Sequence, residues 1–174
     1  MVAAKDDVAH RALAAQFADH SLDRAYYAIV WGRPVPWKGT VIGNIGRHPQ
    51  NRKKMAIVTR GGKSAVTHFE GLEALGDVAS LLRCQLETGR THQIRVHLSS
   101  RGHPVVGDPL YSGRDRFRGG VAGANFAAAV SNLGRQALHA YLIGFTHPAT
   151  GERLRFETPL PDELRALADL ALPR

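Results

Sequence analysis

Five segments with strand character follow one another between residues 24 and 88, and no helical segment separates them. They are rich in aromatic and β-branched residues, and Gly, Pro or polar residues stand between them. Strands joined by short turns pair antiparallel, whereas parallel strands need a crossover that is usually a helix. The order therefore indicates an α+β fold and argues against an alternating α/β fold. The predicted strands cover residues 24–31, 39–45, 54–59, 63–75 and 78–88.

A helix is predicted before these strands, over residues 7–19. Leu13 and Phe17 recur there at helical spacing, and Asp6 and Asp7 stand where caps of a helix N-terminus are expected. The short segment ahead of them, residues 1–5, has the character of the end of a strand.

The remaining predicted elements are a short helix, two strands and a C-terminal helix, over residues 91–100, 137–145, 153–157 and 162–172. We expect Thr91 to cap the short helix. Residues 114–134 are rich in Gly and Ala and predict a long loop, or a loop with a short helix. The expected architecture is a single domain, residues 1–174, with a mixed, mainly antiparallel sheet and flanking helices.

The charge of the chain is strongly positive, with 23 Lys and Arg residues against 15 Asp and Glu residues and a formal net charge of +8. Such a balance predicts an anionic partner, such as RNA, DNA or an acidic membrane surface. A single cysteine, Cys84, excludes an internal disulfide framework and fits a reducing, cytoplasmic compartment. Because Cys84 lies within a predicted strand, we expect a small core residue and not a nucleophile.

The densest polar segment, residues 86–98, reads Leu-Glu-Thr-Gly-Arg-Thr-His-Gln-Ile-Arg-Val-His-Leu. A strand is predicted to end at Thr88, Gly89 allows a tight turn, and the short helix follows. Side chains at such a turn often form functional sites. Arg90 places a planar fork of donors there, suited to a carboxylate or a phosphate. An ordinary solvated arginine is the alternative interpretation of Arg90.

Three histidines near this segment raise the question of a metal site. His92 and His97 are five positions apart, which turns them away from one helix face, and no cysteine pair accompanies them. We therefore expect no metal, and we expect RNA contact or core packing for His92, His97 and His103.

A basic loop and a pair of tyrosines are the other candidate contact groups. Tyr26 and Tyr27 are adjacent on a strand and so face opposite sides of the sheet, with half-buried packing expected for Tyr27. The basic loop is either a solvated face or a nucleic-acid contact. Its cationic residues are Arg47, Arg52, Lys53 and Lys54.

Residues 86–98 closely resemble the third conserved motif of the RluA/RluD-type family of RNA pseudouridine synthases. The similarity follows the family's order over nearly the whole chain, which makes it far more specific than one motif. It includes the family's first helix, its tyrosine-bearing strand, its basic hairpin and two later motifs, at residues 9–17, 24–32, 45–55, 102–111 and 136–140.

The resemblance implies an enzyme that converts uridine in RNA to pseudouridine without metal or cofactor. The family flips the base from its stack, cleaves its N-glycosidic bond, rotates the uracil and rejoins it through carbon. By position, Arg90 matches the arginine that pairs with the catalytic aspartate. Tyr26 matches the tyrosine that stacks on the uracil, and Ile94 the aliphatic residue on its other face. His92 and the basic loop are further substrate-binding candidates, and the implied partner is ribosomal large-subunit RNA, or transfer RNA.

The family's aspartate lies in a motif of the form His-Arg-Leu-Asp, two variable residues, Thr-Ser-Gly, and this sequence does not contain it. The nearest match, residues 20–23, falls after the first helix, so Asp23 is not expected to be the nucleophile. The motif belongs just before residues 1–5, so we expect the catalytic-domain fold to lack its N-terminal strands and the chain to be inactive alone. A fragment, a short protein without catalysis and a separate chain supplying the aspartate are the three explanations.

Two structural expectations follow for a chain without that aspartate. Arg90 should be accessible, bound to an anion or paired with another acid, since a buried unpaired guanidinium costs several kcal/mol. The sheet should show an open edge or an apolar patch near residues 1–4, covered by another copy of the chain. A non-catalytic RNA-binding module is the alternative function, and a hydrolase or metal enzyme that uses the histidines is a third.

Overall fold

The structure, a computed structural model, describes residues 2–112 and 121–171. Within these residues, seven strands form one sheet in the order β3-β2-β4-β5-β1-β6-β7, and every neighbouring pair is antiparallel. The predicted α+β class is thereby confirmed. The strands are β1 (Asp23–Trp31), β2 (Lys38–Arg47), β3 (Met55–Ile57), β4 (Lys63–Leu75), β5 (Ala79–Leu86), β6 (Leu138–Thr146) and β7 (Arg153–Glu157).

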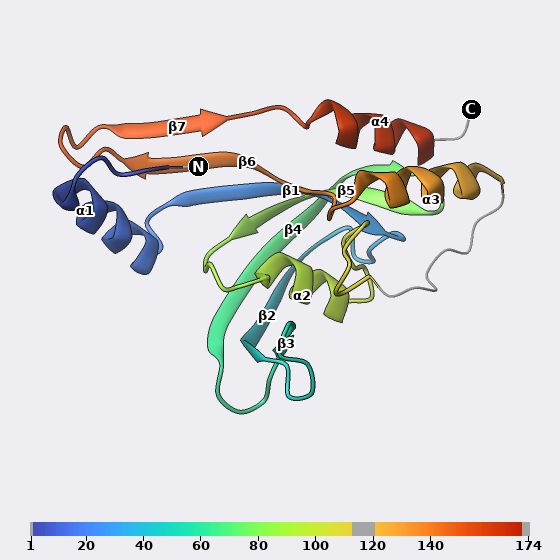
Figure 1. Cartoon of the computed structure of the whole chain (residues 1–174), viewed down its shortest axis with the longest axis horizontal. Coiled ribbons are helices and arrows are strands. Elements are labelled where there is room, and N and C mark those ends of the chain that lie inside the picture. Colours follow the sequence, from blue (N-terminus) through green and yellow to red (C-terminus); the bar gives the residue numbers. More distant parts are fainter. Residues whose placement is uncertain (1, 113–120, 172–174) are drawn as a thin grey trace.

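Helices pack at three places around this sheet (Figure 1). One helix contacts β6 near one end of the sheet, two lie together at the opposite end, and a short one contacts β2, β3 and β4. In that order they are α1 (Asp7–Ala18), α3 (Val121–Leu133) with α4 (Asp162–Ala171), and α2 (Gln93–Ser100). Of the helices in the described ranges, none has the length and apolar character needed to cross a membrane.

The main core lies where the middle strands meet α2, α3 and α4. Ile29 of β1, Leu82 of β5, Phe126 of α3 and Leu164 of α4 are all fully buried in it. Cys84 is buried in the same core, and burial raises the pKa of its thiol to about 12. The expectation that Cys84 is a core residue is therefore confirmed, because a thiol that stays protonated is a poor nucleophile.

The helix ends show how far local signals predict this fold. Asp6 is the N-cap of α1, as expected, and its side chain accepts a hydrogen bond from the Ala9 amide. The expected cap of α2 is wrong, because the helix begins two residues after Thr91 and is preceded by His92 in a left-handed conformation (φ 58°). Gln93 caps the turn instead, accepting from the Arg90 amide and the Thr88 hydroxyl.

Two further expectations change in the structure. The Gly/Ala-rich segment contains α3, a helix of 13 residues, and Phe126 anchors it with its ring edge against Trp31. The part of that segment before residue 121 lies outside the described residues. Residues 2–5 form no strand, because their apolar side chains pack onto α1 and β6 without joining a strand ladder.

The expected open edge is present near these residues. Among the residues that the structure describes, strand β7 ends the sheet and pairs only with β6, and Val2 and Ala4 pack in a cluster that includes Leu154 of β7. Phe156, also on β7, leaves 54% of its surface exposed. An edge strand with an exposed aromatic side chain is a surface on which another strand or chain can pack.

Candidate functional site

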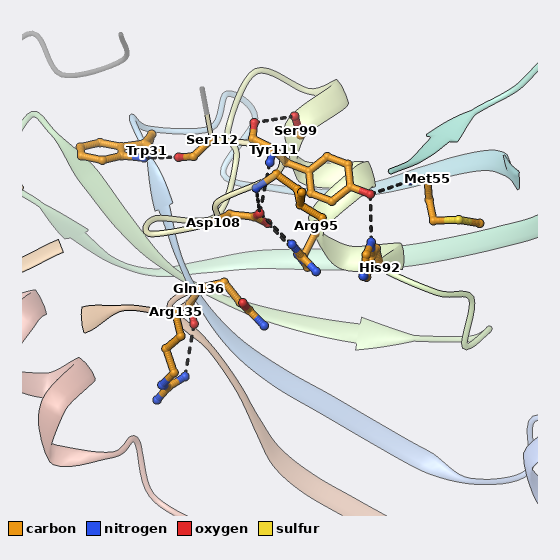
Figure 2. A network of polar contacts seen from close by, with 11 residues as sticks. Trp31, Met55, His92, Arg95, Ser99, Asp108, Tyr111, Ser112, Arg135 and Gln136 are labelled. Carbon is orange, nitrogen blue, oxygen red and sulfur yellow. Dashed lines mark hydrogen bonds and ion pairs between the residues drawn. The ribbon is translucent and has the colours of Figure 1, made fainter. Parts of the chain in front are cut away.

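The candidate site is built around α2, whose residues 93–98 are all buried. One side of the helix packs on the sheet, and residues 102–112 fold back over the other side through contacts such as that of Ser99 with the Tyr111 carbonyl (Figure 2). Both polar and apolar side chains of α2 are therefore enclosed. A buried polar side chain needs a partner, so the polar positions of α2 specify contacts.

Arg95 on α2 and Asp108 in the returning loop form a buried ion pair. The Nε and Nη2 groups of Arg95 donate to the two Asp108 carboxylate oxygens at 2.7 and 2.8 Å. Their side chains are 10% and 0% exposed. Two parallel hydrogen bonds fix the plane of the guanidinium. No described residue accepts a hydrogen bond from Nη1 of Arg95, so this group is left for another acceptor.

The protonation states of this pair are held firmly. Burial by itself would raise the pKa of Asp108, but hydrogen bonds from Arg95 and from the Leu110 and Tyr111 amides keep it below its ordinary value. The hydrogen bond to Asp108 raises the pKa of Arg95 despite its burial. The pair therefore stays charged through the physiological range, which gives α2 a fixed cation.

Tyr111 links this cation to the basic loop. Its ring centroid lies 5.0 Å from Cζ of Arg95, and its hydroxyl accepts from the Met55 amide at 2.8 Å (Figure 2). The same hydroxyl lies 3.0 Å from Nδ1 of His92. Because the Tyr111 hydroxyl already accepts from Met55, we infer that it donates to Nδ1, so that the proton of neutral His92 is on Nε2. Burial lowers the pKa of His92, and Arg95 lowers it further.

The basic loop connects β2 to β3 and is mostly exposed. Nη1 of Arg47 donates to the Arg52 carbonyl at 3.0 Å, which closes the loop on itself. Lys54 lies with Nζ 5.9 Å from the centre of the Tyr111 ring. One cation of the loop, Lys54, and the buried Arg95 thus lie near the same tyrosine ring, although they are far apart in sequence.

The three residues assigned by the resemblance lie in two places. Tyr26 is half-buried and packs against the core cluster that contains the buried Ile94. Arg90 is half-buried as well and extends toward β4, where its Nε donates to the Ser64 carbonyl at 3.0 Å. None of the ion pairs within residues 2–112 and 121–171 involves Arg90. Tyr27 packs as expected, with its ring stacked on Tyr141 at 4.0 Å.

Arg95, Asp108 and Tyr111 were not predicted from the sequence as site residues. Helical periodicity places Arg95 on a different side of α2 from the apolar residues. In the structure, the loop of residues 102–112 covers this second side, which carries Arg95. The signal that was available is the Gly-Asp-Pro-Leu-Tyr segment at 107–111, where an acid and an aromatic side chain flank a proline turn. This segment lies within residues 102–111, one of the motifs in which the chain resembles the family. An acid in such a turn is a candidate partner for an arginine.

Each of the three histidines contacts a different residue. His92 contacts Tyr111, Nδ1 of His97 lies 2.9 Å from the Thr67 hydroxyl, and Nδ1 of His103 lies 2.9 Å from the Trp31 carbonyl. His97 is fully buried and belongs to the core. Of the two roles expected for it, RNA contact and core packing, the structure shows core packing.

The burial of His97 predicts how stability changes with pH. Burial lowers its pKa to about 4, against about 6.5 in an unfolded chain. Because the folded pKa is depressed, the stability from neutral His97 is complete above pH 6.5 and is lost as the pH falls toward 4. We expect a loss of about 3 kcal/mol across this window, measured by urea unfolding. His97→Asn, which keeps a polar group near Thr67, should flatten the profile; an unchanged slope would contradict the assignment.

The chain is similar to known RNA pseudouridine synthases in sequence and in fold. A sequence model of the family described as RNA pseudouridylate synthase matches residues 1–100. The ribosomal large subunit pseudouridine synthase D of Zymomonas mobilis is 48% identical over 169 residues, which cover 96% of this chain and 50% of the relative. The Pseudomonas aeruginosa protein of the same name is 46% identical over 170 residues, 98% of this chain and 52% of its own. The chain spans about half the length of these curated relatives.

Two solved human structures have a similar fold. Human RNA Pseudouridylate Synthase Domain Containing 4 aligns with a TM-score of 0.70 and 25% identity, covering 95% of this chain and 68% of that one. Human RNA Pseudouridylate Synthase Domain Containing 1 aligns with a TM-score of 0.68 and 30% identity, covering 89% and 61%. Most of this chain therefore shares its fold with these two human proteins.

Proposed function

Because this chain belongs to the RNA pseudouridylate synthase family, we propose that it forms the RNA-binding and uracil-binding part of an enzyme that converts uridine to pseudouridine. The proposed substrate is structured RNA, and ribosomal large-subunit RNA in particular, which is the substrate that the names of the curated relatives indicate for those proteins. The net charge of +8 supports an RNA partner.

The observation that carries this proposal is the contact of Tyr111 with both the basic loop and α2. Its hydroxyl binds the Met55 amide at the end of the basic loop, and its ring lies over the Arg95 guanidinium. A phosphate backbone held by the loop would therefore lie beside a fixed cation and the half-buried ring of His92. Base contacts beside phosphate contacts are the arrangement that an enzyme acting on one nucleotide needs.

Within this proposal, the burial and the contacts of four side chains suggest their roles. In this proposal the half-buried Tyr26 stacks on an extruded uracil, and the buried Ile94 lies on the other face of the base. Arg95 is better suited than Arg90 to pair with an aspartate. Its guanidinium is fixed by Asp108, and its Nη1 has no acceptor among the described residues. Arg90, whose Nε donates to the Ser64 carbonyl, would contact the RNA instead.

The chemistry that these groups would serve is an isomerisation. The bond between N1 of uracil and C1′ of ribose breaks, the base rotates, and a bond from C5 to C1′ forms. The hydrogen on C5 leaves to water, and N1 gains one, so the atoms balance. We propose that the aspartate required for this step comes from outside the 174 residues, whose sequence does not contain the aspartate motif.

Release of tritium from RNA labelled at C5 of uridine tests the proposal. The chain alone should bind ribosomal RNA and release no tritium. A chimera that carries the uncovered part of the Zymomonas mobilis relative ahead of Met1 should release tritium, and Tyr26→Ala in that chimera should abolish release. A folded but inactive chimera would contradict the proposed site. Turnover by the chain alone would show that another residue serves as the aspartate.

A non-catalytic RNA-binding module is the second candidate, and the lack of the aspartate motif in this sequence favours it. The same assay separates the two. A module of this kind predicts tight RNA binding by the chain and no tritium release by the chimera.

A further inference from the structure

A cavity of about 370 Å³ lies where the chain enters β1, beside residues 85–88 at the end of β5. His20, Asp23, Arg24 and Glu87 are among its lining residues. The proposed function uses none of them.

Arg24 lacks acceptors for its buried donors. Its Nε and Nη2 atoms are buried and have no hydrogen-bond partner. The guanidinium is nevertheless held in place, with Cζ 5.8 Å from the centre of the Phe17 ring. On its other side lies Gly89, where an added Cβ would stand only 2.2 Å from Nη1. A buried guanidinium without an acceptor is costly, so this geometry points to an acceptor that binds from the cavity.

The rest of the cavity wall leaves the charge of Arg24 uncompensated. Nδ1 of His20 is also buried without a partner. The two carboxylates are already engaged: Asp23 binds Arg153 at 2.7 Å, and Glu87 lies 2.6 Å from Nε2 of His68. The buried polar atoms of the wall that have no partner are therefore nitrogen atoms of Arg24 and His20, and both side chains can donate to an oxyanion.

We propose that Arg24, with His20, binds a phosphate of the RNA backbone in this cavity. The inference rests on the proposed function for its source of phosphate, because the cavity lies beside the turn that carries Arg90. A planar guanidinium with Nε and Nη2 both unpaired matches two oxygens of one phosphate. Binding there would fix the RNA on the opposite side of the turn from the basic loop.

Titration with inorganic phosphate tests the site itself. In NMR spectra recorded at constant ionic strength, the Arg24 Nε–H and His20 ring signals should shift saturably with phosphate. Arg24→Gln should abolish the His20 shift. Gly89→Ala should also abolish the His20 shift, because the added methyl group displaces Nη1 of Arg24 while the charge is kept. This variant replaces Arg24→Gln in the test if Arg24→Gln does not fold. Arg165→Gln removes an equal charge on the distant α4 and should change neither shift. The absence of a saturable shift in the folded wild-type chain would overturn the site.

Binding of ribosomal RNA at several salt concentrations tests the source of the phosphate. RNA should displace inorganic phosphate, and Arg24→Gln should weaken RNA binding about tenfold and lower the salt slope by about one. Phosphate binding that RNA does not displace would overturn the assignment to the RNA backbone. Failure of the wild-type chain to bind RNA at all, with the phosphate shifts intact, would contradict the proposed function instead.

Discussion

Replacing Asp108 with alanine should remove about 3–5 kcal/mol of unfolding free energy, measured by urea denaturation at pH 7. The reason is that Arg95, whose side chain is 10% exposed, would keep its charge without an acceptor for Nε and Nη2. The amides of Leu110 and Tyr111 would also lose the oxygen that both of them bind. The loop over α2 would therefore loosen together with the ion pair.

Two further variants separate the buried pair from ordinary surface charge. Glu157→Gln breaks the exposed pair with Arg155 and should cost about 1 kcal/mol or less. The double variant Arg95→Met with Asp108→Leu should be less destabilised than Asp108→Ala, since it leaves no buried charge. If Asp108→Ala cost no more than Glu157→Gln, the pair would not be the fixed element that the site requires.

Lowering the pH should weaken the Arg95–Asp108 ion pair and so reduce the stability of the folded chain. The pKa of Asp108 is lowered in the folded chain, so its contribution to stability is present above the ordinary aspartate value, near pH 4, and is lost as the pH falls below it. This window lies below that of His97, so the two losses should appear as successive segments of one stability profile.

Neutralising the four cations of the basic loop should weaken binding to ribosomal RNA about 100-fold or more near physiological salt. Each lost phosphate contact should also lower the salt slope by about 0.7–0.9, or about three in total. Glutamine keeps a polar group at each position, so the loop should stay folded. Equilibrium binding measured from low to high salt gives both quantities. The changes are Arg47→Gln, Arg52→Gln, Lys53→Gln and Lys54→Gln.

A matched variant with four cations removed from other exposed positions controls for net charge. It should lose much less affinity and slope, since its residues lie on α1, β7 and α4 and in the segment before α1. Equal losses in the two variants would mean that RNA binds the chain by overall charge, and not at the basic loop. The control changes are Lys5→Gln, Arg11→Gln, Arg155→Gln and Arg165→Gln.

The strands were predictable because each one is bounded by a local signal. Gly76, for example, has a left-handed backbone (φ 57°) and turns the chain between β4 and β5 at the predicted hairpin. The start of α2 was less predictable, because its N-cap His92 makes no side-chain capping hydrogen bond and the Gln93 side chain instead binds Thr88 and Arg90. Gln93 also donates to the Val66 carbonyl on β4, a contact that depends on the tertiary fold.

The candidate site was predictable as a region and not as a set of contacts. The motif at residues 86–98 predicted the region of the candidate site, and the resemblance supplied proposed roles for Tyr26, Arg90 and Ile94. The pairing of Arg95 with Asp108 crosses 13 residues of helix and loop, and no periodicity specifies it. It arises because the loop buries a face of α2 that a solvated helix would expose.

Crosslinking of ribosomal large-subunit RNA that contains 4-thiouridine tests the central claim, that this chain receives a uracil beside β1 and α2. Mass spectrometry of the irradiated complex should place the crosslink on the peptide that contains Tyr26, and Tyr26→Ala should remove it while RNA binding persists. Crosslinks confined to α3 and α4, or an unchanged Tyr26 peptide crosslink in the Tyr26→Ala variant, would contradict the account.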